Sequence, residues 1–261
     1  MELKNNEILI TGGTSGIGLA LAKELSQRGN KVVVLGRSKD RLSAVQSEYP
    51  EILTFQADVA DRQSLIALQE WLPSHLPNLN IVINSAGVMK AHNMLDPELD
   101  LDALLSEIEI NLVGTITVDK LFLPQLIKQN EAMIVNISSG LAYLSSAPHP
   151  TYSASKAGVQ MFTSALRDQL AYAGKRNVHV MELVPPLVSE TNLENVTSSG
   201  SFGDMPLDDL VSAAIKGMEQ NKKRVNAGAA KVLRKMRNTA SDKTEETMAK
   251  ESLKQYFPEG L

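Results

Sequence analysis

Short apolar runs alternate along the chain with longer stretches in which apolar residues recur every three or four positions. The short runs are rich in Val, Ile and Leu without strict alternation, which is typical of strands buried on both faces. They predict strands at residues 7–11, 31–35, 52–56, 79–84, 132–137 and 178–184. The longer stretches predict helices at residues 17–28, 39–48, 61–72, 99–122, 152–173 and 207–220.

This alternation predicts an α/β fold. Repeated strand–helix units form a doubly wound parallel sheet with helices on both faces, and we expect about seven strands. No strong boundary interrupts the first 187 residues, so we expect a single domain spanning residues 1–261.

Two later regions have a different character. Residues 189–206 are rich in Ser, Asn and Gly and predict a loop, and their place after a strand favours a substrate lid over a plain linker. Residues 229–257 are charged and helical in pattern. We interpret them as a solvated helical face, with a subunit contact as the alternative.

Composition narrows the function classes. The 261 residues include 26 Lys and Arg against 30 Asp and Glu, and a net charge of −4 disfavours nucleic-acid binding. The chain has no cysteine, which excludes thiolate chemistry and fits a reducing, cytoplasmic compartment. No apolar run approaches the roughly 20 residues that span a bilayer. The four histidines show no metal-ligand spacing, so we expect no metal site.

A glycine-rich turn, TGGTSGIG at residues 11–18, follows the first strand. Glycine permits positive φ and close approach of the backbone to a phosphate, and the next helix directs its unpaired N–H groups to the same point. A purely structural turn is the plain alternative. We expect a dinucleotide to bind at Gly12, Thr14, Ser15, Gly16, Ile17 and Gly18.

The spacing G-x-x-x-G-x-G after Thr11 resembles that of the short-chain dehydrogenase/reductase family, and further motifs extend the resemblance over about residues 7–190. It implies a Rossmann-type fold, hydride transfer between a nicotinamide cofactor and a carbonyl or alcohol, and homodimers or homotetramers. Pro185-Pro186 and the segment Ser139-Gly140-Leu141-Ala142 resemble the DltE-type subgroup of bacterial oxidoreductases.

The end of the second strand bears on the choice between NAD and NADP. A carboxylate there would bind the ribose hydroxyls of NAD and repel the 2′-phosphate of NADP. The sequence has Gly36 where the acid is expected, followed by Arg37 and Ser38, which can bind a phosphate. We expect NADP(H), with NAD(H) as the second choice. Solvated arginines beside a helix cap are the plain alternative.

The resemblance implies further cofactor contacts. Asp58 would receive the adenine amino group with Val59 near the ring, because Asp61 is better placed to cap the next helix. The family motif N-N-A-G corresponds here to Asn84-Ser85-Ala86-Gly87, so Asn84, Ala86 and Gly87 would pass close to the adenosine ribose.

The segment after the sixth strand departs from the family pattern. Pro185 and Val188 keep their places, and the Val188 backbone would meet the nicotinamide carboxamide. Pro186 replaces a glycine and Glu190 replaces a threonine, while Thr191 comes one residue late. These changes put the expected hydroxyl contact with the diphosphate in doubt.

Tyr152 and Lys156 lie one helical turn apart, and a nearby ammonium favours the phenolate of a tyrosine whose ordinary pKa is about 10. Alone, this pair is ordinary. Ser139, thirteen residues before Tyr152, matches the family's catalytic serine better than Ser138 and would bind the substrate oxygen. The resemblance implies that Asn111 supports a proton relay, and a satisfied core amide is the plain alternative.

These residues predict an NADP(H)-dependent oxidoreductase that acts on a small carbonyl or alcohol, with Tyr152 as the general acid or base and carbonyl reduction as the preferred direction. A regulatory protein that senses NADP(H) without turnover is the alternative, and a scaffold role through residues 229–257 is a third possibility. Residues 89–94, 141–149 and 187–205 are expected to form the substrate pocket.

Overall fold

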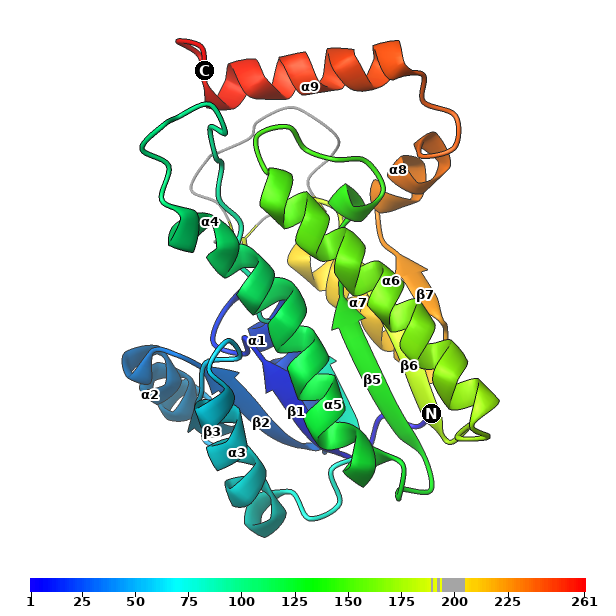
Figure 1. Ribbon diagram of the computed structural model, residues 1–261. Coiled ribbons are helices and arrows are strands. Elements are labelled where there is room, and N and C mark those ends of the chain that lie inside the picture. The colour runs from blue at the N-terminus through cyan, green and yellow to red at the C-terminus, as the bar shows by residue number, and fades with distance from the viewer. Residues whose placement is uncertain (189, 192, 194–204) are drawn as a thin grey trace.

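The computed structural model describes residues 1–188, 190, 191, 193 and 205–261 and contains one seven-stranded parallel sheet (Figure 1). Its strand order is β3-β2-β1-β4-β5-β6-β7, and each neighbouring pair is parallel. The strands are β1 (Glu7–Thr11), β2 (Lys31–Gly36), β3 (Leu53–Gln56), β4 (Ile81–Asn84), β5 (Ala132–Ile137), β6 (Val178–Val184) and β7 (Arg224–Asn226). The predicted Rossmann-type doubly wound fold is therefore confirmed.

Helices cover both faces of the sheet. One apolar cluster joins the sheet to α1 (Gly16–Gln27), α2 (Lys39–Glu48) and α7 (Leu207–Glu219). The second joins it to α3 (Arg62–His75), α5 (Gly114–Leu126) and α6 (Pro150–Tyr172). The residues of β1, β2, β4, β5 and β6 are mostly buried on both faces because each face is covered by helices. Within the described ranges, no helix is long and apolar enough to cross a bilayer.

The predicted helix at residues 99–122 corresponds to one helical stretch at residues 101–126 that contains a π-helical turn. The structure has α4 (Leu101–Ile108), then a π-helical turn (Glu109–Val113), then α5. Asn111 lies in that turn and its side chain bonds the backbone of Val88. The wider turn re-aims one polar side chain without ending the helix, as such insertions commonly do at functional sites.

The remaining regions follow the predictions in outline. The charged segment forms two helices, α8 (Ala230–Met236) and α9 (Asp242–Tyr256). A short 3₁₀ turn, Gly140–Ala142, follows β5. Most of the predicted lid at residues 189–206 lies outside the described residues.

A buried polar cluster ties the middle of the sheet to two helices. The Asn84 amide donates to Asp119 Oδ1 at 2.6 Å and to Asn136 Oδ1 at 2.8 Å. The Asn136 amide donates to Asp119 Oδ2 at 2.9 Å and to Thr163 Oγ1 at 3.1 Å. Burial raises the pKa of Asp119 from 3.8 to about 7, against the lowering effect of its two amide donors. Asn84 thus links β4 to β5 and to α5.

The raised pKa predicts a pH-dependent stability. From about pH 4 to about pH 7 the folded chain holds a proton on Asp119 that the unfolded chain has lost, so this group lowers the free energy of unfolding as pH rises. Asp119→Asn removes the titration and should flatten this part of the profile, while lowering overall stability because its amide N–H groups face other donors. Urea unfolding at several pH values measures both slopes. Equal slopes would contradict the raised pKa.

Candidate active site

The glycine-rich turn and the chain after β4 pack backbone against backbone. A Cβ at Gly12 would lie 2.7 Å from Ala86 Cα, and Gly12 has a φ of +64°. A Cβ at Gly18 would lie 2.4 Å from the carbonyl oxygen of Gly12. The Thr11 hydroxyl closes the junction by accepting the N–H groups of Ser85 at 3.1 Å and Ala86 at 3.0 Å. Only glycine fits this cradle, and its bare backbone suits the close approach of a diphosphate.

The start of α1 completes the cradle. Ser15 is the N-cap residue, and in the described structure its side chain makes no capping bond. No acidic residue lies in the first turn of α1, so no side-chain carboxylate there competes with a bound anion for the positive end of the helix dipole. Thr14 fills the space beside Gly36, where a Cβ would come within 2.6 Å of Thr14 Cγ2. Ile17 packs against the core cluster behind the turn.

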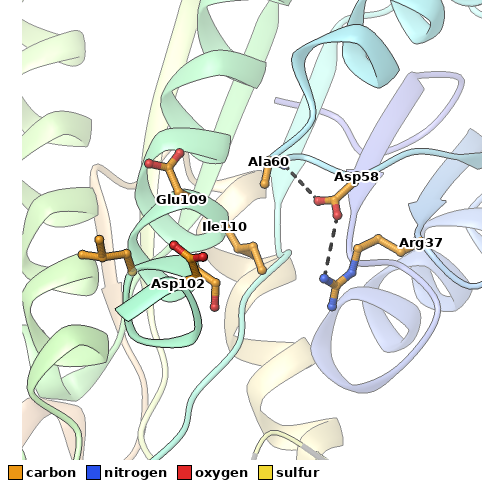
Figure 2. A pocket seen from close by; sticks show the side chains of 8 residues that line it. Arg37, Asp58, Ala60, Asp102, Glu109 and Ile110 are labelled. Atoms are coloured by element: carbon orange, nitrogen blue, oxygen red, sulfur yellow. Dashed lines mark hydrogen bonds and ion pairs between the residues drawn. The ribbon is translucent and has the colours of Figure 1, made fainter. Parts of the chain in front are cut away.

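A pocket of about 420 Å³ opens beside the carboxyl ends of β2 and β3 (Figure 2). Arg37 and Asp58 point toward one another across it, with Arg37 Nη1 3.8 Å from Asp58 Oδ2. Asp102, Glu109 and Ile110 lie across from this pair. Its lining residues are Arg37, Asp58, Ala60, Asp102, Leu105, Ser106, Glu109 and Ile110. The pocket thus joins the predicted phosphate-binding and adenine-binding residues in one place.

The neighbours of this pocket have structural roles of their own. Ser38 is the N-cap of α2, and its hydroxyl accepts the N–H of Arg41 at 3.3 Å. Asp58 Oδ1 accepts the N–H of Ala60 at 2.9 Å. Asp61 caps α3 by accepting the N–H of Gln63 at 2.9 Å, as predicted. Val59 packs against the backbone at Gly114, where a Cβ would come within 2.8 Å.

Lys156 and Tyr152 lie on the buried side of α6, one turn apart. The Lys156 amino group donates to the carbonyl of Ile137 at 2.9 Å and lies 5.7 Å from the centre of the Tyr152 ring. Burial lowers the pKa of Lys156 from 10.5 to about 8. A Cβ at Gly87 would come 3.4 Å from this amino group, so the predicted ribose-binding segment borders α6.

Asn111 is buried and fully bonded. Its Oδ1 accepts the N–H of Val88 at 2.8 Å, and its Nδ2 donates to the Val88 carbonyl at 2.9 Å and to Ser155 Oγ at 3.1 Å. Its Oδ1 lies 3.3 Å from the position of a Cβ at Gly87, beside Lys156. The structure therefore brings Asn111, Tyr152 and Lys156 together.

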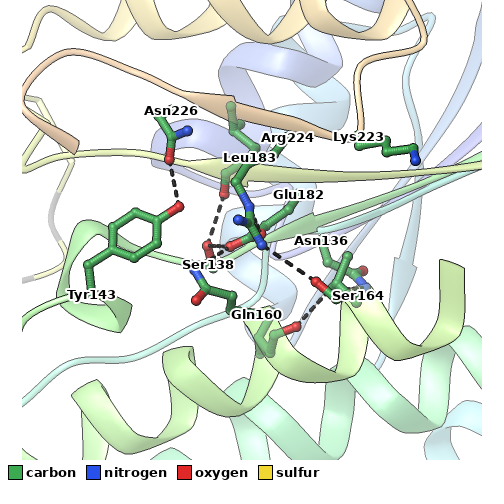
Figure 3. Close-up of polar contacts among 12 residues, drawn as sticks. Asn136, Ser138, Tyr143, Gln160, Ser164, Glu182, Leu183, Lys223, Arg224 and Asn226 are labelled. Atoms are coloured by element: carbon green, nitrogen blue, oxygen red, sulfur yellow. Dashed lines mark hydrogen bonds and ion pairs between the residues drawn. The ribbon is translucent and has the colours of Figure 1, made fainter. Parts of the chain in front are cut away.

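The two serines after β5 have different surroundings. Ser138 is buried and donates to Glu182 at 2.6 Å, within a polar network that Figure 3 shows around that carboxylate. Gln160 donates to the same carboxylate at 3.1 Å, and Arg224 forms an ion pair with it. Ser139 instead starts the 3₁₀ turn and accepts the Leu141 N–H at 3.1 Å. The Ser138 hydroxyl is thus committed to the core.

The segment after β6 supplies a residue that sequence reasoning left unassigned. The Pro185 carbonyl accepts the N–H of Gly140 at 2.9 Å, and the Val188 carbonyl accepts the Thr191 hydroxyl at 2.8 Å. Thr191 Cγ2 lies 3.5 Å from the position of a Cβ at Gly16, beside the glycine-rich turn. Glu190 has a φ of +65° and accepts the N–H of Leu207 at the start of α7. The signal in the sequence for this contact was Thr191 itself, which stands one residue after the position of the family's threonine.

The charged C-terminal segment packs on its own chain near these residues. Leu233 of α8 lies 2.7 Å from the position of a Cβ at Gly140, next to Ser139. The ring of Tyr256 in α9 packs edge to face against the ring of His149, with 4.7 Å between the ring centroids. His149 is three residues before Tyr152 in the chain. Figure 1 shows α9 beyond the carboxyl ends of the strands, at the same end as the start of α6.

Three comparisons with known proteins agree with this geometry. The family model described as short chain dehydrogenase matches residues 6–200. DltE of Bacillus subtilis, named as an uncharacterized oxidoreductase, is 36% identical over 250 residues, covering 95% of this chain and 98% of its own. Two solved Burkholderia short-chain dehydrogenases share the fold at lower identity.

The Burkholderia cenocepacia structure, in complex with NADP, has a TM-score of 0.79 and 22% identity, and the match covers 95% of this chain and 99% of that one. The Burkholderia phymatum structure, in complex with NAD, has a TM-score of 0.75 and 21% identity, with 86% and 89% covered. At these identities the likeness shows the fold alone.

The steric fit at Gly12 generates a matched prediction. Gly12→Ala should destabilise the fold by at least about 2 kcal/mol more than Gly174→Ala, because both positions have positive φ but only Gly12 faces backbone within 3 Å. Urea unfolding of the two variants measures the difference. A loss of equal size in both would show that the Gly12–Ala86 approach is unimportant.

Proposed function

We propose, from the premise that this chain belongs to the short-chain dehydrogenase family and to its DltE-like subgroup, that it is an NADP(H)-dependent oxidoreductase acting on a carbonyl or alcohol. Family membership supports an oxidoreductase. The observation that carries the finer proposal is the buried Lys156 amino group, which lies beside Tyr152 and borders Asn111. Ser139 lies at the carboxyl end of β5, where ligands of open α/β sheets bind.

The glycine cradle fits a dinucleotide, as its steric demands at Gly12 and Gly18 indicate. Residues of the turn would hold the diphosphate, and Lys156 with the segment at Gly87 would hold the nicotinamide ribose. Pro185 and Val188 would border the nicotinamide. When bound, the nicotinamide would supply or accept a hydride at its C4.

The proton chemistry belongs to the chain. In carbonyl reduction, the hydroxyls of Ser139 and Tyr152 would donate hydrogen bonds to the substrate oxygen, and Tyr152 would transfer its proton as negative charge develops there. Charged Lys156 stabilises the phenolate that remains. A pKa of about 8 keeps Lys156 mostly protonated at neutral pH. Asn111 would support the return of a proton from solvent.

The preference for NADP(H) rests on the end of β2. A side chain at Gly36 would collide with Thr14, so this position has no room for the ribose-binding carboxylate of an NAD site. We assign the pocket beside the ends of β2 and β3 to the adenosine and call it the adenosine pocket. Arg37 is the one basic side chain among the described residues that line it. Its side chain is 59% exposed, which leaves it accessible to a 2′-phosphate.

One observation favours NAD(H) as the alternative cofactor. Asp58, Asp102 and Glu109 line the same pocket, and their negative charges would repel a phosphate. The preference between NADP(H) and NAD(H) depends on whether the attraction of Arg37 for the phosphate outweighs the repulsion by these carboxylates.

Retention of all four residue types at positions 111, 139, 152 and 156 argues against a sensor without turnover. Cytoplasmic location, assembly into dimers or tetramers, and carbonyl reduction as the direction stay predictions.

Turnover tests the proposed activity directly. Wild-type protein should oxidise NADPH in the presence of some members of a panel of aldehydes and ketones, as followed by absorbance. Tyr152→Phe should lower kcat by about 100-fold or more, since it removes the general acid, but should still bind NADPH. Tyr172→Phe, a change at a 96% exposed tyrosine of the same helix, is the control. Equal turnover in wild type and Tyr152→Phe would refute the assigned role.

Fluorescence titration tests the cofactor. Arg37→Ala should weaken NADPH binding by about tenfold or more and leave NADH binding nearly unchanged, because a charge-assisted bond to the 2′-phosphate is lost. Arg176→Ala removes the same charge from an exposed turn before β6 and controls for net charge. If wild type binds NADH as tightly as NADPH, the cofactor is reassigned.

A further inference from the structure

Two helices beside the site are joined by a second set of buried polar bonds that the mechanism above does not use. Glu107 of α4 is completely buried, although an unpaired carboxylate at such a place would cost several kcal/mol. Its Oε1 accepts the N–H of Lys90 at 2.7 Å, and its Oε2 accepts the hydroxyl of Thr151. Thr151 directly precedes Tyr152 in the chain.

Histidine 92 completes the surroundings of this carboxylate. His92 is buried, and its Nε2 lies 3.4 Å from Glu107 Oε2. The backbone N–H of His92 donates to the backbone carbonyl of Pro148 at 2.9 Å, just before α6. The segment after β4 is therefore bonded on one side to α4 and on the other to the chain that enters α6.

These contacts repeat the pattern that Asn111 makes one turn later. Glu107 and Asn111 are four residues apart, as are Thr151 and Ser155, so each pair lies on one face of its helix. Asn111 bonds both Val88 and Ser155, while Glu107 bonds both Lys90 and Thr151. The backbone at residues 88–90 is thus held by two parallel polar contacts between the helices.

We infer that Glu107 and Thr151 form a positioning pair that fixes the start of α6, and with it the Tyr152 phenol, against the segment at residues 88–92. The inference rests on the proposed function for its catalytic meaning and extends it to residues outside the Asn111, Ser139, Tyr152 and Lys156 set. Glu107 and Thr151 act through Tyr152 and the chain after β4. Because that chain is also expected to line the substrate pocket, the pair couples the wall of the pocket to the proton donor.

The geometry separates this role from cofactor binding. The glycine cradle and the adenosine pocket contain neither Glu107 nor Thr151 among their described contacts. A displacement of about 1 Å at the proton donor can cost a factor of about 100 in rate. Loss of the Thr151 hydroxyl should therefore lower kcat while the affinity for NADPH stays unchanged.

The test uses full-length protein with two substitutions. Thr151→Val replaces the hydroxyl with a methyl group, and Thr151→Ser keeps the hydroxyl. Thr117→Val is the matched control, because among the described residues the Thr117 hydroxyl bonds the Val113 carbonyl of its own helical stretch. Hydrogen–deuterium exchange of the NADPH complex should quicken at residues 88–92 and at the start of α6 in Thr151→Val alone. This readout needs no substrate, so it decides whether the pair holds the segment even if wild type turns over no carbonyl.

Steady-state kinetics then test the catalytic meaning. With a carbonyl that wild type reduces, Thr151→Val should lose about 10- to 100-fold in kcat at an unchanged KM for NADPH, and Thr151→Ser should recover most of the loss. Unchanged exchange in Thr151→Val overturns the inference, as does an unchanged kcat. Wild type without turnover refutes the proposed function instead. If Thr151→Val does not fold, Glu107→Gln, which keeps the size of the side chain, takes its place.

Discussion

Burying the amino group of Lys156 costs free energy, and much of the polar structure around the site offsets that cost. The carbonyl of Ile137 accepts a hydrogen bond from this amino group, and Gly87 leaves room for the amino group beside the Asn111 amide. These groups come from the chain after β4, the end of β5, the π-helical turn and α6. The parallel sheet, whose strands all end at one edge, brings these segments to one amino group. The burial in turn lowers the pKa of Lys156 to about 8, and at this value the amino group is still mostly protonated at neutral pH.

Much of this arrangement could be predicted from the sequence, since its signals are local. Runs such as VVVL at residues 32–35 are apolar on both faces of a strand and indicate a covered parallel sheet. The glycine spacing at residues 12–18 reports a backbone demand that the steric contacts of Gly12 and Gly18 make explicit. Arg224–Asn226 gave no such signal, because a three-residue strand with one apolar side chain has no period to detect.

The features that could not be predicted depend on partners distant in the chain. Glu107 lies in an amphipathic stretch and gave no sign that it is buried, because its partners Lys90 and Thr151 are 17 and 44 residues away. Thr191 lies beside the glycine-rich turn and follows Glu190, which has a left-handed backbone conformation. Glutamate rarely adopts that conformation, so the residue type did not predict it. Nothing in the sequence showed that Asp102 and Glu109 line the same pocket as Arg37, because α4 and the π-helical turn bring them there from a distant part of the chain.

The two strands at the borders of the sheet, β3 and β7, have four and three residues. A border strand offers unpaired backbone N–H and C=O groups to any other extended chain, and a long, flat one is a template for aggregation. Here each border offers only a few such groups, and Lys222 and Lys223 place two positive charges just before β7. The brevity of β7, which hid it in the sequence, thus protects the folded chain from adding strands of its neighbours at that side.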